Sequence, residues 1–289
     1  MTAALRVVGV HGVGNHRPSA TPAQASDQLS VIWRRALARR FPAPVDLTVA
    51  YYADHLYRGG RHGADDDLPP EARELLVTWL REFDVPASLT HGNATRPIRQ
   101  ALAWIAERRG LAPRMVELFV TTFFREVARY LRTDHVREAS RDAVAAAIHT
   151  HRPSVVLAHS LGSVVAYETL WHNPNLELDL LVTLGSPLAL PHAVFPHLYP
   201  APVDDLGARP PNVRRWVNIA DPGDLVAIPP GGISSRFADV AADHTSVIHA
   251  FDFHLVANYL ACPPLATELS LTAGDPILKP GLGHRPPVS

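Results

Sequence analysis

Short apolar runs alternate with amphipathic segments along most of the chain, and this alternation predicts an α/β protein. The apolar runs predict buried strands at Val7–His11, Val45–Tyr52, Ser154–His159, Leu178–Leu184 and Arg214–Ile219. Apolar residues at helical spacing predict helices at Gln24–Phe41, Arg137–Thr150, Leu161–His172 and His254–Ala261. Because the strands are apolar on both faces and alternate with helices, we expect a mostly parallel central sheet flanked by helices.

Three successive helical patterns interrupt this alternation, with no strand pattern between them. They cover Glu71–Phe83, Pro97–Arg109 and Arg114–Arg132. The third has a wide apolar face that needs a partner surface, formed by Val116, Phe119, Val120, Phe123, Phe124 and Val127. We therefore expect a lid-like helical insertion at about residues 68–133, before the strand Ser154–His159. We expect residues 1–262 to form one domain that includes it, and Pro263–Ser289 to be a loose, Pro-rich tail.

Composition excludes several classes of protein. The 27 basic and 28 acidic residues give a net charge of -1, which provides no field for binding nucleic acid. Cys262 is the sole cysteine, so no disulfide can form within the chain. The first residues lack the pattern of a secretory signal, and the most apolar stretch, Leu118–Phe124, is too short to cross a bilayer. We expect a cytoplasmic protein with no stable membrane insertion.

The segment Ala158-His159-Ser160-Leu161-Gly162 joins a predicted strand to a predicted helix. It resembles the Gly-x-Ser-x-Gly nucleophile elbow of the α/β-hydrolases, with alanine in place of the first glycine. Small residues two positions either side of the serine allow the sharp turn that exposes its hydroxyl. Ser160 is the candidate nucleophile, and the Leu161 N–H at the helix start is a candidate oxyanion donor. The alternative is that Ser160 only caps the helix.

The segment Val8 to Asn15, which includes the end of the first predicted strand, contains His11-Gly12-Val13-Gly14. It resembles the His-Gly oxyanion loop of lipases and esterases, which implies that Val13 N–H is the second oxyanion donor. Gly12 and Gly14 would let the backbone approach a substrate closely, and His11 would orient the loop. A phosphate-binding loop is the alternative, but the third glycine and the lysine of such loops are missing.

A triad of this type runs serine, acid, histidine along the chain. After the last predicted strand, Asp221-Pro222-Gly223-Asp224 resembles the acid loop of lipases, with Asp224 at the acid position and Asp221 as the alternative. His254 immediately precedes the last predicted helix, where the histidine of this fold is found, and His249 is the alternative base. The spacing of these histidines is not that of helical zinc ligands, so we expect no metal site.

Together, these segments and Leu184-Gly185-Ser186-Pro187 resemble the α/β-hydrolase superfamily, nearest to bacterial lipases and esterases. The resemblance implies cleavage of a carboxylic ester through an acyl-enzyme on Ser160, with His159 beside the nucleophile as a supporting residue. It implies no cofactor and a small-molecule ester or acyl substrate. A peptidase or amidase, an acyltransferase or cyclase, and a non-catalytic binding protein remain alternatives. The sequence does not indicate an oligomeric state.

Overall fold

The computed structural model describes residues 4–57, 68–86, 95–248 and 254–274. Its centre is a six-stranded sheet in the order β2-β1-β3-β4-β6-β8, in which every neighbouring pair is parallel. The strands of this sheet are β1 (Leu5–Val10), β2 (Val45–Ala50), β3 (Val155–His159), β4 (Leu178–Leu184), β6 (Val213–Ala220) and β8 (Ala242–Thr245). A separate parallel pair is formed by β5 (Gly207–Ala208) and β7 (Phe237–Ala238).

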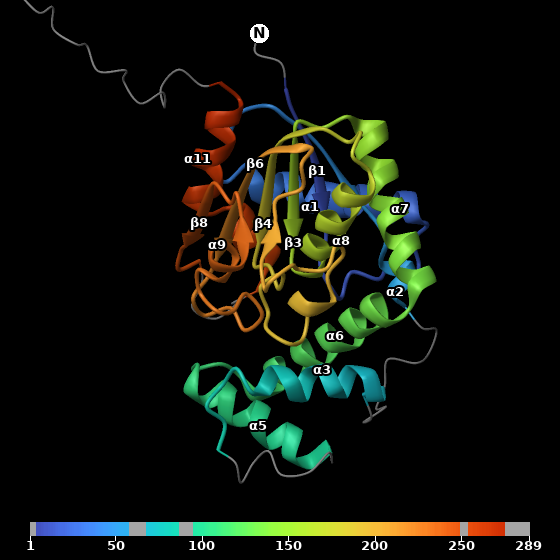
Figure 1. Cartoon of the computed structure of the whole chain (residues 1–289). Coiled ribbons are helices and arrows are strands. Elements are labelled where there is room, and N and C mark those ends of the chain that lie inside the picture. Colours follow the sequence, from blue (N-terminus) through green and yellow to red (C-terminus); the bar gives the residue numbers. More distant parts are fainter. Residues whose placement is uncertain (1–3, 58–67, 87–94, 249–253, 275–289) are drawn as a thin grey trace, which may run out of the picture.

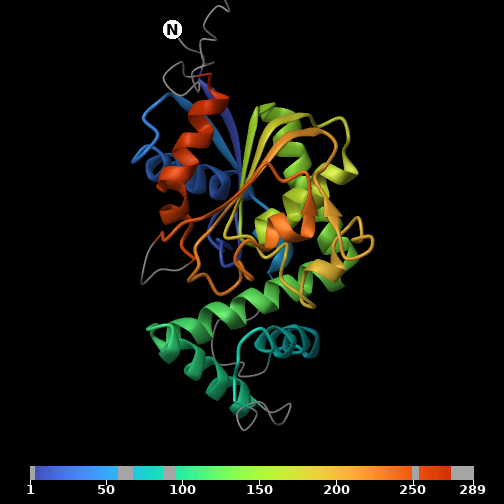
Figure 2. The same ribbon diagram turned by 60° about the vertical axis from the view of Figure 1, so that its left-hand side comes forward.

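Helices cover both faces of the sheet (Figure 2). One face carries α1 (Pro22–Leu37), α10 (Val256–Leu260) and α11 (Pro263–Thr272), and the other α7 (Asp134–His151) and α8 (Leu161–His172). Two apolar clusters, one on each face, form the core. Short elements in the connections are α2 (Ala53–Leu56), α9 (Gly232–Arg236) and the 3-10 turn η1 (Phe195–His197). This arrangement confirms the predicted α/β class with a parallel central sheet.

The three helices predicted between the second and third strands form a layer of their own beyond one end of the sheet (Figure 1). They are α3 (Pro70–Leu80), α5 (Thr95–Arg108) and α6 (Pro113–Arg132), and we call them the helical block. Of the predicted apolar face of α6, all but Phe119 is fully buried. Part of that face packs within the block, where the rings of Trp79 and Phe124 lie 5.5 Å apart.

The end of the chain differs from the sequence-based expectation. Residues 263–272, expected to begin a loose tail, form α11, and the helix expected at His254–Ala261 is only Val256–Leu260. Prolines at the start of α11 are compatible with a helix because the first turn needs no intrahelical N–H donors. Leu265 and Leu269 are buried against the sheet. No helix among the described residues is long and apolar enough to span a membrane.

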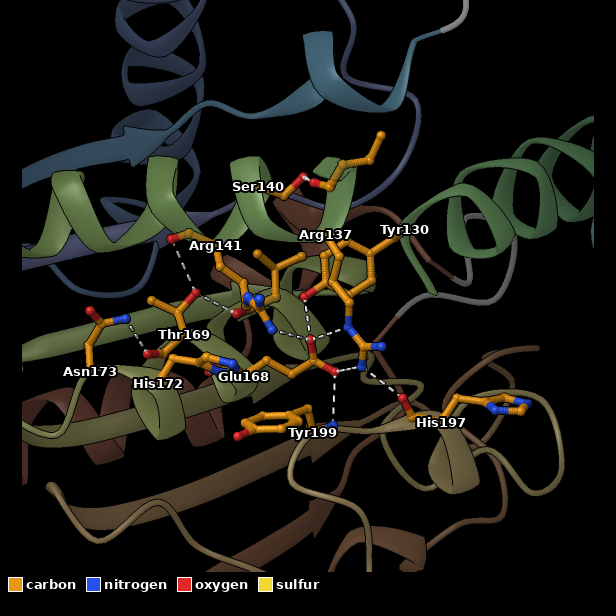
Figure 3. Close-up of polar contacts among 12 residues, drawn as sticks. Tyr130, Arg137, Ser140, Arg141, Glu168, Thr169, His172, Asn173, His197 and Tyr199 are labelled. Carbon is orange, nitrogen blue, oxygen red and sulfur yellow. Dashed lines mark hydrogen bonds and ion pairs between the residues drawn. The ribbon is translucent and has the colours of Figure 1, made fainter. Parts of the chain in front are cut away.

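A buried carboxylate joins the helical block to the rest of the protein (Figure 3). Glu168 on α8 accepts hydrogen bonds from the Tyr130 hydroxyl on α6 (2.7 Å) and from Arg137 Nε on α7 (2.8 Å). A second Arg137 nitrogen bonds the other carboxylate oxygen, which also accepts from Tyr199 N (3.1 Å). Thr133 alone separates α6 from α7. Glu168 therefore fixes the point at which the helical block rejoins the core.

Candidate active site

The candidate residues lie where the strand order of the sheet reverses. β1 and β3 are neighbours in the sheet. From β1 the chain continues to β2 on one side, and from β3 it continues to β4 on the other side, so it leaves these two strands in opposite directions. Open parallel sheets bind their ligands at such a switch point, outside the carboxyl ends of the strands. Gly12 follows β1 and Ser160 follows β3, which places both at this position.

Ser160 has a backbone conformation that non-glycine residues rarely adopt, with φ 55° and ψ -132°. Such conformations cost on the order of 1–3 kcal/mol and concentrate at functional sites. The Ser160 side chain makes no capping hydrogen bond with α8, contrary to the helix-cap alternative. Its Oγ is buried and has no hydrogen-bond partner among the described residues. The turn therefore fixes the position of the Ser160 hydroxyl, and this hydroxyl makes no hydrogen bond that stabilises the described part of the fold.

Two glycines permit the close packing around this turn. A side chain at Gly162 would collide with the carbonyl oxygens of Val10 and His11, so glycine lets α8 start directly against the end of β1. A Cβ at Gly12 would lie 2.5 Å from Ser160 Cβ and 3.1 Å from its Oγ. The His-Gly loop therefore lies in direct contact with the Ser160 side chain.

The structure brings Asp224 and His254 together. Asp224 Oδ2 lies 2.7 Å from His254 Nδ1, and both side chains are buried. Because an ionised carboxylate only accepts hydrogen bonds, Nδ1 carries the proton in this pair. In the neutral imidazole, Nε2 then has a free lone pair, and this atom is buried with no partner among the described residues. The bond to Asp224 thus holds the imidazole in the tautomer with the proton on Nδ1 and the lone pair on Nε2, and this lone pair can accept a proton.

Asp221 has a different environment. Its Oδ1 accepts from Gly223 N (2.7 Å) and its Oδ2 from Ile248 N (2.6 Å). These bonds close the turn after β6 and tie it to the segment following β8. Asp221 therefore makes the turn contacts expected of an Asp-Pro-Gly sequence, while Asp224 contacts the histidine. The alternative base, His249, lies outside the described residues.

Tyr259 on α10 also contacts the candidate acid. Its hydroxyl donates to Asp224 Oδ2 (2.7 Å) and accepts from Asp221 N (3.0 Å). Burial and the neighbouring Asp224 carboxylate raise the pKa of Tyr259, so the hydroxyl stays protonated and keeps donating. Asp224 Oδ1 also accepts from Val226 N (3.0 Å). These bonds hold the carboxylate in place toward His254. No sequence motif marked this tyrosine.

His11 orients the loop as a neutral imidazole. Burial lowers the pKa of His11 to about 4. Its Nε2 lies 3.3 Å from the Tyr52 N–H and so must accept, which leaves Nδ1 to donate to Gly12 O at 2.8 Å. The ring also stacks on Tyr52, with centroids 4.2 Å apart. His11 therefore joins the loop to the backbone that follows β2.

Two rings surround the candidate base. The His159 ring lies 4.7 Å from that of His254, and Phe119 of α6 lies 4.8 Å from it on another side. Burial lowers the pKa of His159 well below its usual value, so this ring is neutral. Ser160 is fully buried and His254 is 9% exposed, so both candidate side chains are buried.

Within the described residues, no three His, Cys, Asp or Glu side chains are placed to hold a metal ion. Comparison with protein-family models, with curated proteins and with solved structures gives no match to this chain.

Proposed function

We propose that the protein is a serine hydrolase of the α/β-hydrolase type that cleaves a carboxylic ester through an acyl-enzyme on Ser160. One observation carries the proposal: Asp224 binds His254 Nδ1, while His254 Nε2 and Ser160 Oγ are both buried without a hydrogen-bond partner among the described residues. A strained serine between a parallel strand and a helix, next to a His-Gly loop, adds support.

In the proposed mechanism, His254 Nε2 takes the Ser160 proton as Oγ attacks the ester carbonyl carbon. Asp224 stabilises the imidazolium that forms. The tetrahedral oxyanion is bound by the N–H groups of Val13 and Leu161; as the first residue of α8, Leu161 has no intrahelical acceptor for its N–H. His254 then protonates the leaving alcohol, and in the second half of the reaction it activates the water that releases the acid.

The proposed substrate has an apolar acyl group. Phe119 contacts His254, and the rings of Phe119 and Phe123 lie 6.0 Å apart on the same helix face. An apolar chain bound here would be buried against Phe119, which favours association by about 25 cal/mol per Å² of apolar surface. We also propose that the helical block serves as a lid, because its α6 contacts the base through Phe119 and both Ser160 and His254 are buried.

Acyl transfer is the second candidate function, and burial of the site favours it. With Ser160 fully buried and His254 nearly so, a bound alcohol or amine could reach the acyl-enzyme in preference to water. Product analysis with an added alcohol distinguishes the two reactions, since a transferase forms the new ester and a hydrolase forms the acid.

The test is a series of p-nitrophenyl esters of graded acyl length, with p-nitroanilides of the same acyl groups for comparison. We expect wild type to hydrolyse the esters well above the rate of Ser160→Ala and to leave the anilides unreacted. Equal ester rates for wild type and Ser160→Ala would contradict catalysis by Ser160. Faster cleavage of the anilides would replace the esterase proposal with an amidase.

A further inference from the structure

The peptide planes of the loop after β1 are held by side chains that the proposed mechanism does not use. Asn15 Nδ2 donates to Gly12 O and to Val13 O, both at 3.0 Å. The peptide bonds Gly12–Val13 and Val13–Gly14 are both trans, so in each of them the N–H points opposite to the carbonyl. Because Gly12 O faces Asn15 and His11 Nδ1, the direction of the Val13 N–H is fixed.

The next peptide is held from both ends. Its carbonyl, Val13 O, bonds to Asn15, and its N–H, that of Gly14, donates to the Glu126 carboxylate at 3.0 Å and 3.2 Å. Gly14 has a φ of +72°, a left-handed conformation that glycine adopts without strain. Burial raises the pKa of Glu126 to about 7, although the bond from Gly14 N–H opposes that rise. At pH 8 the carboxylate therefore predominates.

Glu126 reaches the loop from α6, and the helical block also contacts the base and the backbone on either side of the acid. Phe119, seven residues before Glu126 and on the same helix face, lies against His254. On α3, Trp79 Nε1 donates to Leu225 O (2.9 Å), immediately after Asp224. Arg109, just after α5, donates to Pro222 O (3.3 Å). The helical block thus touches the base, the acid loop and the oxyanion loop together.

We propose that Glu126 is a positioning residue that, opposite Asn15, fixes the orientation of the Val13 N–H for oxyanion binding. This inference rests on the proposed function, because it assigns Val13 as an oxyanion donor. It makes the helical block part of the catalytic apparatus: the oxyanion loop is complete only while α6 lies in the observed position.

The test measures kcat and KM at pH 8 on the best p-nitrophenyl ester. Glu126→Ala should lower kcat by about 10- to 100-fold with KM within about twofold, because a misoriented donor weakens transition-state binding more than substrate binding. Glu126→Gln should recover most of kcat, since its amide oxygen can accept from Gly14 N–H. Asn15→Ala releases the opposite side of the same peptide and should show the same loss of kcat.

Glu117→Ala is the matched control. Glu117 lies on the same helix, but it pairs with Arg99 on α5 (3.0 Å) instead of reaching the loop. Its removal should leave kcat unchanged. Wild-type kcat in both Glu126→Ala and Asn15→Ala would overturn the inference, as would a Glu126→Gln variant as impaired as Glu126→Ala. If Glu126→Ala does not fold, Asn15→Ala and Glu126→Gln test the inference. A loss of kcat in Asn15→Ala with most of kcat kept in Glu126→Gln supports it, and wild-type kcat in Asn15→Ala overturns it.

Failure of this inference is separable from failure of the proposed function. If Ser160→Ala hydrolyses the ester as fast as wild type, the proposed function is wrong. If Ser160→Ala is inactive while Glu126→Ala and Asn15→Ala match wild type, only the positioning role is wrong.

Discussion

Asp224→Asn should lower kcat for ester hydrolysis by about 1,000- to 10,000-fold, the size of loss seen when a triad carboxylate becomes an amide. In the wild-type protein, Asp224 Oδ2 accepts hydrogen bonds from both His254 Nδ1 and the Tyr259 hydroxyl. An asparagine whose amide nitrogen faced these groups would favour the imidazole tautomer with its proton on Nε2. That tautomer cannot take the proton of Ser160. The variant keeps the size of the side chain, so the loss should fall on kcat far more than on KM.

Asp221→Asn is the matched control for this prediction, since it makes the same chemical change three residues away. Asp221 bonds the backbone of Gly223 and Ile248, so its change should lower thermal stability and leave kcat within about tenfold of wild type. Steady-state kinetics and the thermal unfolding midpoint would be measured for both variants. A larger loss of kcat in Asp221→Asn than in Asp224→Asn would reverse the assignment of the acid.

Glu168→Ala should destabilise the protein by about 3–5 kcal/mol, the usual effect of removing one partner of a buried ion pair. The Glu168 side chain is fully buried, and its removal leaves the Arg137 guanidinium without its carboxylate partner. The Tyr130 hydroxyl and Tyr199 N–H lose their acceptor as well. For a chain of this size we expect the thermal midpoint to fall by roughly 10 °C.

Glu74→Ala provides the comparison, because Glu74 forms an exposed ion pair with Arg132 at 4.0 Å near the same junction. Exposed pairs contribute about 0–1 kcal/mol, so this variant should unfold close to the wild-type temperature. Thermal unfolding followed by circular dichroism measures both. If Glu168→Ala and Glu74→Ala unfold at the same temperature, Glu168 does not stabilise the junction of the helical block.

Elements with a strong hydrophobic period were predictable from the sequence. The strands β3 and β4 and the helices α6 and α8 lie within a few residues of their predicted ranges. β8 was missed because Ala242-Asp243-His244-Thr245 is short and polar. In the part of the chain that the structure describes, it lies at the edge of the sheet and pairs with β6 alone. α11 is not predictable in the same way, because its two leading prolines are typical of a loop as well as of a helix start.

Local motifs and chain order led to Ser160, Asp224 and His254 as candidates, and the structure brings the last two into contact. Asn15, Glu126 and Tyr259 could not be found in the same way. The bond between Gly14 and Glu126 joins residues 112 positions apart, and no pattern in a single sequence indicates such a pairing. The orientation of the Asn15 amide depends on the loop conformation, which only the folded chain defines.

The most direct test of the central claim, that Ser160 is an activated nucleophile, is labelling with a fluorophosphonate probe followed by mass spectrometry of the labelled peptide. The account predicts one phosphonyl group per chain on Ser160 in wild type, no labelling of Ser160→Ala, and strongly reduced labelling of His254→Ala. An unlabelled wild-type protein, or equal labelling of wild type and Ser160→Ala, would contradict it.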